Sequence, residues 1–267
     1  MASMKEIREH IASIQSTQKV TNAMYLIAST KMRRAKEDLA KTRPFFDAVS
    51  TQIEQIFQHA GEIESPYLYR GNADDLAQPG TYAYLVVTAD RGLAGAYNQN
   101  VIQETMKRLE KHPDSRLFVV GGNGRHFFSG HGVPVEKSFR YDAQSPTLRR
   151  AREITAKLLA LFARGEETEE KPIRFEPSAE EVLARVVPAY ITGFLYSAMV
   201  DSFRAEQNAR ASAMDSANQN EDDMLRELQL EYNHERQGAI TSEITEVSAG
   251  ARSKKNHMKK EAQHAHR

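Results

Sequence analysis

The sequence of 267 residues contains no cysteine and no tryptophan. The lack of cysteine excludes disulfide bonds and thiolate metal sites, and it fits a reducing compartment. Basic and acidic residues balance at 36 each, so the formal net charge is zero. A balanced charge argues against a dedicated nucleic-acid binder. No apolar run approaches the length of a membrane span, and we expect the basic, polar N-terminus to hold no signal-peptide core. Any membrane association is therefore expected to be indirect.

Catalytic and cofactor motifs are also missing. Gly121-Gly122-Asn123-Gly124 follows a predicted strand, but it lacks the dinucleotide glycine spacing and a following Gly-Lys-Ser/Thr, so we predict a strand-ending turn. His126 and His131 have no carboxylate pair nearby and form no metal-ligand pattern. Nothing pairs a nucleophile with a base at a recognisable spacing. The residues therefore predict no catalytic, cofactor or metal site of the chain's own.

What the sequence does contain is a long apolar seam at its N-terminal end. Spacings of four and three residues run through seven heptads from Ile7 to Ile56, and twelve of the fifteen seam positions are apolar. A 3.5-residue repeat sustained this long predicts a left-handed coiled coil. Pro44 interrupts it and predicts a bend rather than a stop.

The C-terminal end carries a second, shorter seam. Ile240, Ile244 and Val247 recur at helical spacing in a stretch without proline. A frayed end would not need such a seam, so we expect it to pack against the N-terminal helix. Residues 7–56 and roughly 200–250 are thus predicted to form an antiparallel, left-handed coiled coil.

Between these ends the pattern changes to that of a small α/β domain. Residues 82–88 and 116–120 read as strands, 99–111 and 147–164 as helices, and 134–139 as a short third strand. This order predicts a Rossmann-like insert of parallel strands. After Pro188 the chain is predicted to return to helix, with a possible pause at Gly193.

Four motifs in the right order resemble the γ subunit of F-type ATP synthases. The resemblance covers almost the whole chain. The motifs are Thr21-Asn22-Ala23-Met24 with Ser29-Thr30-Lys31-Met32-Arg33-Arg34-Ala35, Asp90-Arg91-Gly92-Leu93-Ala94-Gly95-Ala96-Tyr97-Asn98, Phe175-Glu176-Pro177-Ser178, and Ile240-Thr241-x-Glu243-x-x-Glu246-x-x-x-Gly250-Ala251-x-Ser253. The lack of cysteine and of a transit sequence favours a bacterial form.

The resemblance implies a fold and a function. It implies a coiled-coil helix over 1–60, an α/β domain over 78–178, a second coiled-coil helix over 179–253 and a basic extension over 254–267. It further implies the central rotor shaft of a membrane-bound F1Fo complex, peripheral on the cytoplasmic side of a bacterial cell membrane. Expected partners are the α and β subunits of the α3β3 hexamer, the ε subunit and the c ring. The family has no nucleotide chemistry on γ, so no cofactor is implied.

The resemblance also implies partner contacts. Arg236 and Gln237 match a pair that contacts β beside the shaft, and Phe175 and Glu176 match the foot that touches the c ring. Further positions match the contact with acidic lever segments of β or the loop beside it. These are Met24, Lys31, Arg33, Arg34, Asp90, Arg91, Gly92 and Leu93.

Three features depart from the family pattern. Asn22 replaces a usual lysine, residues 254–267 extend past the usual end, and only six residues separate Gly165 from Pro172 where relatives have a strand and a long loop. We therefore predict one strand fewer in the sheet. Two other functions stay open at this point: a non-rotary coiled-coil scaffold with an inserted α/β domain and, less favoured, an enzyme of Rossmann type.

Overall fold

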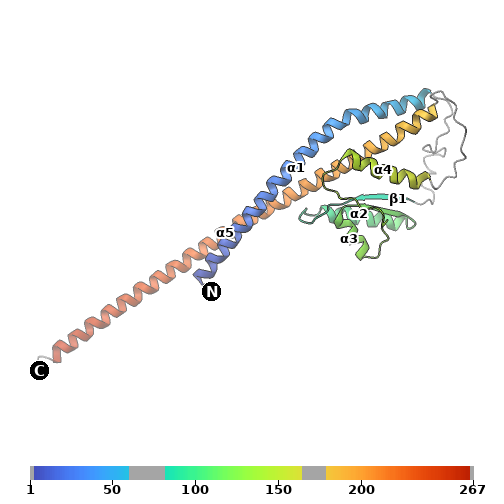
Figure 1. Cartoon of the computed structure of the whole chain (residues 1–267). Coiled ribbons are helices and arrows are strands. Elements are labelled where there is room, and N and C mark those ends of the chain that lie inside the picture. Colours follow the sequence, from blue (N-terminus) through green and yellow to red (C-terminus); the bar gives the residue numbers. More distant parts are fainter. Residues whose placement is uncertain (1–2, 60–81, 164–178, 265–267) are drawn as a thin grey trace. The chain divides into compact units, whose positions relative to one another are not determined.

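The computed structural model describes residues 3–59, 82–163 and 179–264. Most of them are helical. The elements in chain order are α1 (Met4–His59), β1 (Ala83–Val87), α2 (Tyr97–Lys111), β2 (Arg116–Val120), α3 (Gly122–Gly130), α4 (Leu148–Ala163) and α5 (Ala179–His264) (Figure 1). They divide into a terminal unit, residues 1–24 with 214–267, and a central unit, residues 25–213. Helices α1 and α5 contribute a stretch to each unit.

The seam predicted on α1 is confirmed by burial. Every one of its fifteen positions is buried or partly buried, whereas most residues between them are exposed. The seam positions are Ile7, Ile11, Ile14, Gln18, Thr21, Tyr25, Ala28, Met32, Ala35, Leu39, Thr42, Phe46, Val49, Ile53 and Ile56. The helix continues through Pro44 without a break.

In the terminal unit, α1 and α5 run antiparallel. Arg8 donates to the Tyr232 hydroxyl at 2.6 Å, and Gln18 donates to the Asp222 carboxylate at 2.6 Å. Residue numbers therefore rise along α1 as they fall along α5. Beneath these polar contacts Ile7 is 2% exposed.

The same antiparallel pairing holds inside the central unit. The Phe46 ring lies against Gly193, so closely that a Cβ on that glycine would meet the ring at 1.5 Å. Ala35 packs into a cluster with Met199 and Phe203. The expected pause at Gly193 is wrong, because this glycine makes room for an aromatic ring within a continuous helix. Helix α5 also contains Pro188 and continues past residue 253 to His264.

The α/β domain holds a parallel two-stranded sheet. β1 pairs with β2 from Ala83 opposite Arg116 to Val87 opposite Val120. Side chains alternate along β2: one face contributes Leu117 to a cluster with residues of α2 and α3, and the other contributes Phe118 to a cluster with residues of α4 and α5. Both faces are thus buried, as parallel sheets require.

The strand predicted over residues 134–139 is wrong. The segment forms no ladder with β2: an isolated bridge joins Leu117 to Val135, and a second one joins Val120 to Tyr141 just after the segment. Pro134 has no backbone donor, which leaves this segment without a regular ladder. Within the described residues, β1 is paired on one side only.

One stretch of α5 qualifies as a membrane span by length and composition. It lies within Glu181–Lys254, and 33% of the tested window is buried. By that measure the expectation of no such run is wrong. The helix also contributes Leu183, Met199 and Val200 to the interior at 0, 2 and 1% exposure, so its apolar residues supply core packing.

Candidate partner-binding site

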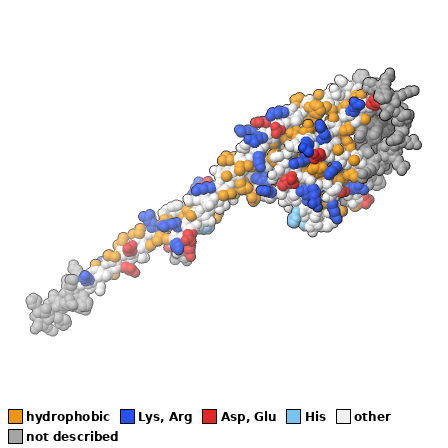
Figure 2. Space-filling view, viewed as in Figure 1, with side chains coloured by type: hydrophobic (Ala, Val, Ile, Leu, Met, Phe, Trp, Pro, Cys, Tyr) orange, Lys and Arg blue, Asp and Glu red, His pale blue; other side chains and the backbone are white. Residues whose placement is uncertain are grey.

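The far end of α5 presents an uncovered apolar stripe. Ile240, Ile244 and Val247 are 45, 62 and 68% exposed, and hydrophobic side chains are visible along this stretch in Figure 2. The expectation that they pack on α1 is wrong. Because α1 begins at Met4 and Arg8 lies opposite Tyr232, the antiparallel pairing ends near residue 236.

Arg236 and Gln237 lie where that pairing ends. Both side chains are exposed. The hydroxyl of the neighbouring Thr241 donates a hydrogen bond to the Gln237 backbone carbonyl at 2.8 Å, so this hydroxyl is used within the helix. Contact of this pair with another subunit remains a prediction.

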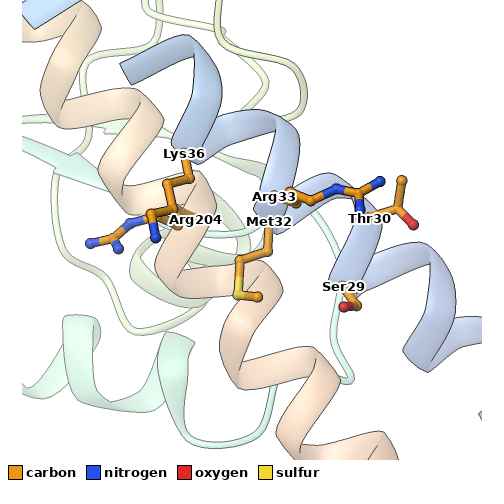
Figure 3. Close-up of a pocket in the computed structure, with 6 residues that line it drawn as sticks. All are labelled: Ser29, Thr30, Met32, Arg33, Lys36 and Arg204. Carbon is orange, nitrogen blue, oxygen red and sulfur yellow. The ribbon is translucent and has the colours of Figure 1, made fainter. Parts of the chain in front are cut away.

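A shallow hollow of about 440 Å³ lies between α1 and α5 in the central unit. Its lining is Ser29, Thr30, Met32, Arg33, Lys36 and Arg204 (Figure 3). Lys36 of α1 and Arg204 of α5 both line the hollow, and Figure 3 shows Met32 pointing from α1 toward α5. Arg204 pairs with Asp201 at 3.3 Å. The lining of the hollow therefore includes three cationic side chains and the apolar side chain of Met32.

Sequence reasoning found part of this surface. Lys31, Arg33 and Arg34 were expected contacts, and all three are exposed. Lys36 belongs to the same basic run and could have been included. Arg204 is distant in sequence, so only the pairing of the helices reveals it. Met24, in the terminal unit, is partly buried on α1.

The Asp90–Leu93 loop is held from within the central unit. The Asp90 carboxylate accepts hydrogen bonds from the backbone N–H groups of Gly122 at 3.0 Å and of Ala143 and Gln144 at 2.9 Å each. Its oxygens are thus used internally. Arg91 is exposed, and Leu93 is 64% exposed with a φ of +62°. The loop therefore presents Arg91 and Leu93 while Asp90 fixes its shape.

The glycine motif after β2 is not a turn, contrary to expectation. Helix α3 begins at Gly122, and Gly121 precedes it with a φ of +101°. A Cβ on Gly121 would stand 2.2 Å from the Thr88 carbonyl oxygen. These glycines serve close packing of α3 beside β1, which explains the motif without a phosphate ligand.

The histidines, metal ligands and c-ring contact considered from the sequence have different outcomes. His131 stacks on Phe127, with ring centroids 4.0 Å apart. Among the residues that the structure describes, no group of three or more His, Cys, Asp or Glu could hold a metal ion. Phe175 and Glu176 lie outside the described residues, as does the short link from Gly165 to Pro172.

Comparison with known proteins gives one consistent result. A family model described as ATP synthase matches residues 3–169 and 164–253. The ATP synthase gamma chain of Ruminiclostridium cellulolyticum is 34% identical over 93% of this chain and 97% of its own length. That of Acetivibrio thermocellus is 35% identical over 94% and 99%.

Two solved structures show a similar fold. The chain matches the Tetrahymena thermophila mitochondrial ATP synthase central stalk and c-ring with a TM-score of 0.54 and 18% identity, over 74% of this chain and 99% of that one. It matches a chain of the Euglena gracilis mitochondrial OSCP/F1/c-ring assembly with a TM-score of 0.57 and 12% identity, over 94% of both.

The alignments also show that this chain is shorter than its relatives over the matched region. The first relative aligns over 289 positions, more than the 267 residues available here, so gaps must fall in this chain. The two parts matched by the family model overlap at residues 164–169. The prediction of one strand fewer concerns this junction and remains a prediction.

Proposed function

This chain belongs to the family of ATP synthase gamma chains, and on that premise we propose that it is the central rotor shaft of such a complex. The shaft turns with an ion-driven c ring and couples this rotation to ATP synthesis or hydrolysis on an α3β3 hexamer. The chain supplies no catalytic site. Its place is peripheral, on the cytoplasmic side of a bacterial cell membrane, with the ε subunit beside its α/β domain.

The uncovered end of α5 is the observation that carries this proposal. Ile240, Ile244 and Val247 are exposed on a helix that has no partner in the described chain beyond residue 236. A row of large aliphatic side chains is unfavourable in water and indicates an interaction surface. In the proposed complex, the inner wall of the hexamer surrounds this end.

The cationic hollow supports a second, electrostatic contact. Arg33, Lys36 and Arg204 line it, and Lys31 and Arg34 are exposed on the same helix. We assign this surface to acidic lever segments of β. Exposed ion pairs contribute about 0–1 kcal/mol each, so such contacts can re-form at every step of a rotation.

The remaining assigned contacts follow the family motifs. Arg91 and Leu93, on the loop that Asp90 and Gly92 shape, lie beside the β contact. Met24 is assigned to the same interface, and Phe175 and Glu176 to the c ring. The α/β domain is the Rossmann-like insert, and α1 with α5 forms the left-handed coiled coil.

Replacing Arg236 and Gln237 together by alanine tests the proposal. ATP turnover or assembly of the complex should fall, while the unfolding of the isolated chain should not change, because both side chains are exposed. The matched control replaces Arg226 and Gln229, also exposed on α5, by alanine and should leave turnover unchanged.

Two results would contradict the proposal. One is unchanged turnover in a fully assembled Arg236→Ala, Gln237→Ala complex, which refutes the assigned contact. The other is failure of the unaltered chain to co-purify stoichiometrically with a nucleotide-binding hexamer, which is the behaviour of a coiled-coil scaffold.

A further inference from the structure

The loop of residues 88–98 lies directly on one stretch of α5, within the central unit. Gly95 has a φ of +52°, and a Cβ there would stand 3.6 Å from the Ala209 carbonyl oxygen. Ala94 is 2% exposed. The loop backbone thus lies close beside the helix, so that a Cβ on Gly95 would be in van der Waals contact with Ala209.

The Tyr97 hydroxyl joins three elements at this contact. It donates to the Val87 carbonyl at 3.3 Å and shares a 2.5 Å hydrogen bond with the Ser202 hydroxyl. Val87 ends β1, Tyr97 begins α2 and Ser202 belongs to α5. Burial raises the pKa of Tyr97, and the charge of Glu206 acts in the same direction against the Ser202 hydrogen bond. The hydroxyl therefore stays protonated and able to donate at neutral pH.

Arg210 makes a second polar link at the same contact. Its guanidinium pairs with Glu206 at 2.5 Å and donates to the Gly92 carbonyl at 3.1 Å. Glu206 is 4% exposed, and Gln207 donates to the same carboxylate oxygen at 3.3 Å. One buried ion pair thus also holds the loop backbone, and its geometry is fixed by directional bonds.

An apolar cluster also joins the α/β domain to α5. Phe118 and Phe139 pack in a cluster with Met199 and Phe203. Apolar burial is strong but non-directional, so it resists separation more than it resists sliding. Hydrogen bonds weaken steeply when their angles change. We therefore expect the polar links to oppose rotation of the domain against the helix more than the apolar cluster does.

We propose that Gly92, Tyr97, Ser202, Glu206 and Arg210 form a torsional latch that fixes the α/β domain to α5. This rests on the proposed rotor function, in which torque applied to the domain must reach the helix. Tyr97 and Arg210 are positioning residues: they touch no substrate and act through the register that they impose.

Two conservative variants open the latch without removing its packing. Tyr97→Phe keeps the ring and removes the hydroxyl. Arg210→Lys keeps a charge for Glu206 but lacks the planar fork that also reaches Gly92. The control is Tyr196→Phe, a tyrosine of α5 that is 9% exposed in the apolar cluster and makes no hydrogen bond among the described residues.

The test uses the assembled complex and two measurements. Amide hydrogen exchange of residues 89–98 reports opening of the loop. A bead attached through Lys107→Cys on α2, an exposed position in a chain without cysteine, reports angular fluctuation with the hexamer fixed and nucleotide absent. The loss of one hydrogen bond should cost about 1 kcal/mol, which is about fivefold in an equilibrium constant. The exchange rate of the loop and the fraction of time that the bead spends at wide angles should therefore each rise about fivefold.

The outcomes separate the alternatives. A rise in both quantities in Tyr97→Phe and Arg210→Lys, but not in Tyr196→Phe, supports the latch. Faster exchange with an unchanged bead distribution overturns the torsional role, and unchanged exchange overturns the latch itself. If the unaltered chain does not assemble with a hexamer, the proposed function fails instead, and exchange in the isolated chain still decides whether the latch exists.

Discussion

Two stretches of α5 carry apolar residues at helical spacing and differ in what covers them. In the central unit, Met199 and Phe203 are 2 and 9% exposed because α1 and the α/β domain pack over them. In the terminal unit, Ile240 and Ile244 are 45 and 62% exposed. One helix thus contains a stretch that is covered within the chain and a stretch that nothing in the described part of the chain covers.

The largest difference should appear on truncating one residue from each stretch. Phe203→Ala should lower the free energy of unfolding by about 3–5 kcal/mol, because it empties a packed site. Ile244→Ala should change it by less than about 0.5 kcal/mol. Urea denaturation of the isolated chain measures both, and similar losses would break the comparison.

The second prediction asks what covers the terminal stretch. Replacing Ile240, Ile244 and Val247 together by serine should barely alter the isolated chain. In a complex that buries these side chains, losing roughly 1 kcal/mol of apolar burial at each position would raise the dissociation constant from the hexamer about a hundredfold. Titration of labelled chain with the hexamer measures this, and an unchanged dissociation constant would show that the stripe is not the contact.

Glycine substitutions sharpen the comparison further. Gly193→Ala should cost about 1–3 kcal/mol, because its Cβ would overlap the Phe46 ring. Gly238→Ala, with nothing within 4 Å, should stabilise the helix by up to about 1 kcal/mol. Thermal unfolding measures both effects. A melting temperature that shifts in the same direction in both variants would contradict the comparison.

The smallest effect should lie far from α5. The pKa of Glu136 is lowered, chiefly because the Ser138 hydroxyl and also its amide donate to the carboxylate. This contribution is fully present above the ordinary value of 4.5 and is lost as pH falls through the lowered pKa. The melting temperature of Glu136→Gln should therefore fall slightly less than that of the unaltered chain as the pH is lowered. Melting curves from pH 7 to pH 3 would show this, and parallel curves would contradict it.

Local patterns predicted much of the fold. The α1 seam, the strand over residues 116–120 and the helices near 99–111 and 147–164 all appear, because each depends on periodicity within one segment. Helix α3 was missed because its glycines resemble a turn. Glycine is needed here because Thr88 lies so close to Gly121, and this contact forms only after β1 and β2 pair.

The candidate site was less accessible to sequence reasoning. Periodicity predicted that Ile240 and Ile244 need cover, but not that α1 ends before reaching them. The place of Arg204 in the cationic hollow and the contact of Arg210 with Gly92 both depend on packing between distant segments. Exposure of Arg236 and Gln237 agrees with a partner contact and does not test it.

The antiparallel pairing of α1 with α5 also sets the order of events during synthesis. Arg8 and its partner Tyr232 are 224 positions apart. At about 5–20 residues per second, a ribosome needs roughly 11–45 s to deliver the second after the first. For most of that interval the N-terminal end of the α1 seam lacks the stretch of α5 that covers it. We therefore expect the nascent chain to depend on a chaperone that holds this seam until translation nears its end.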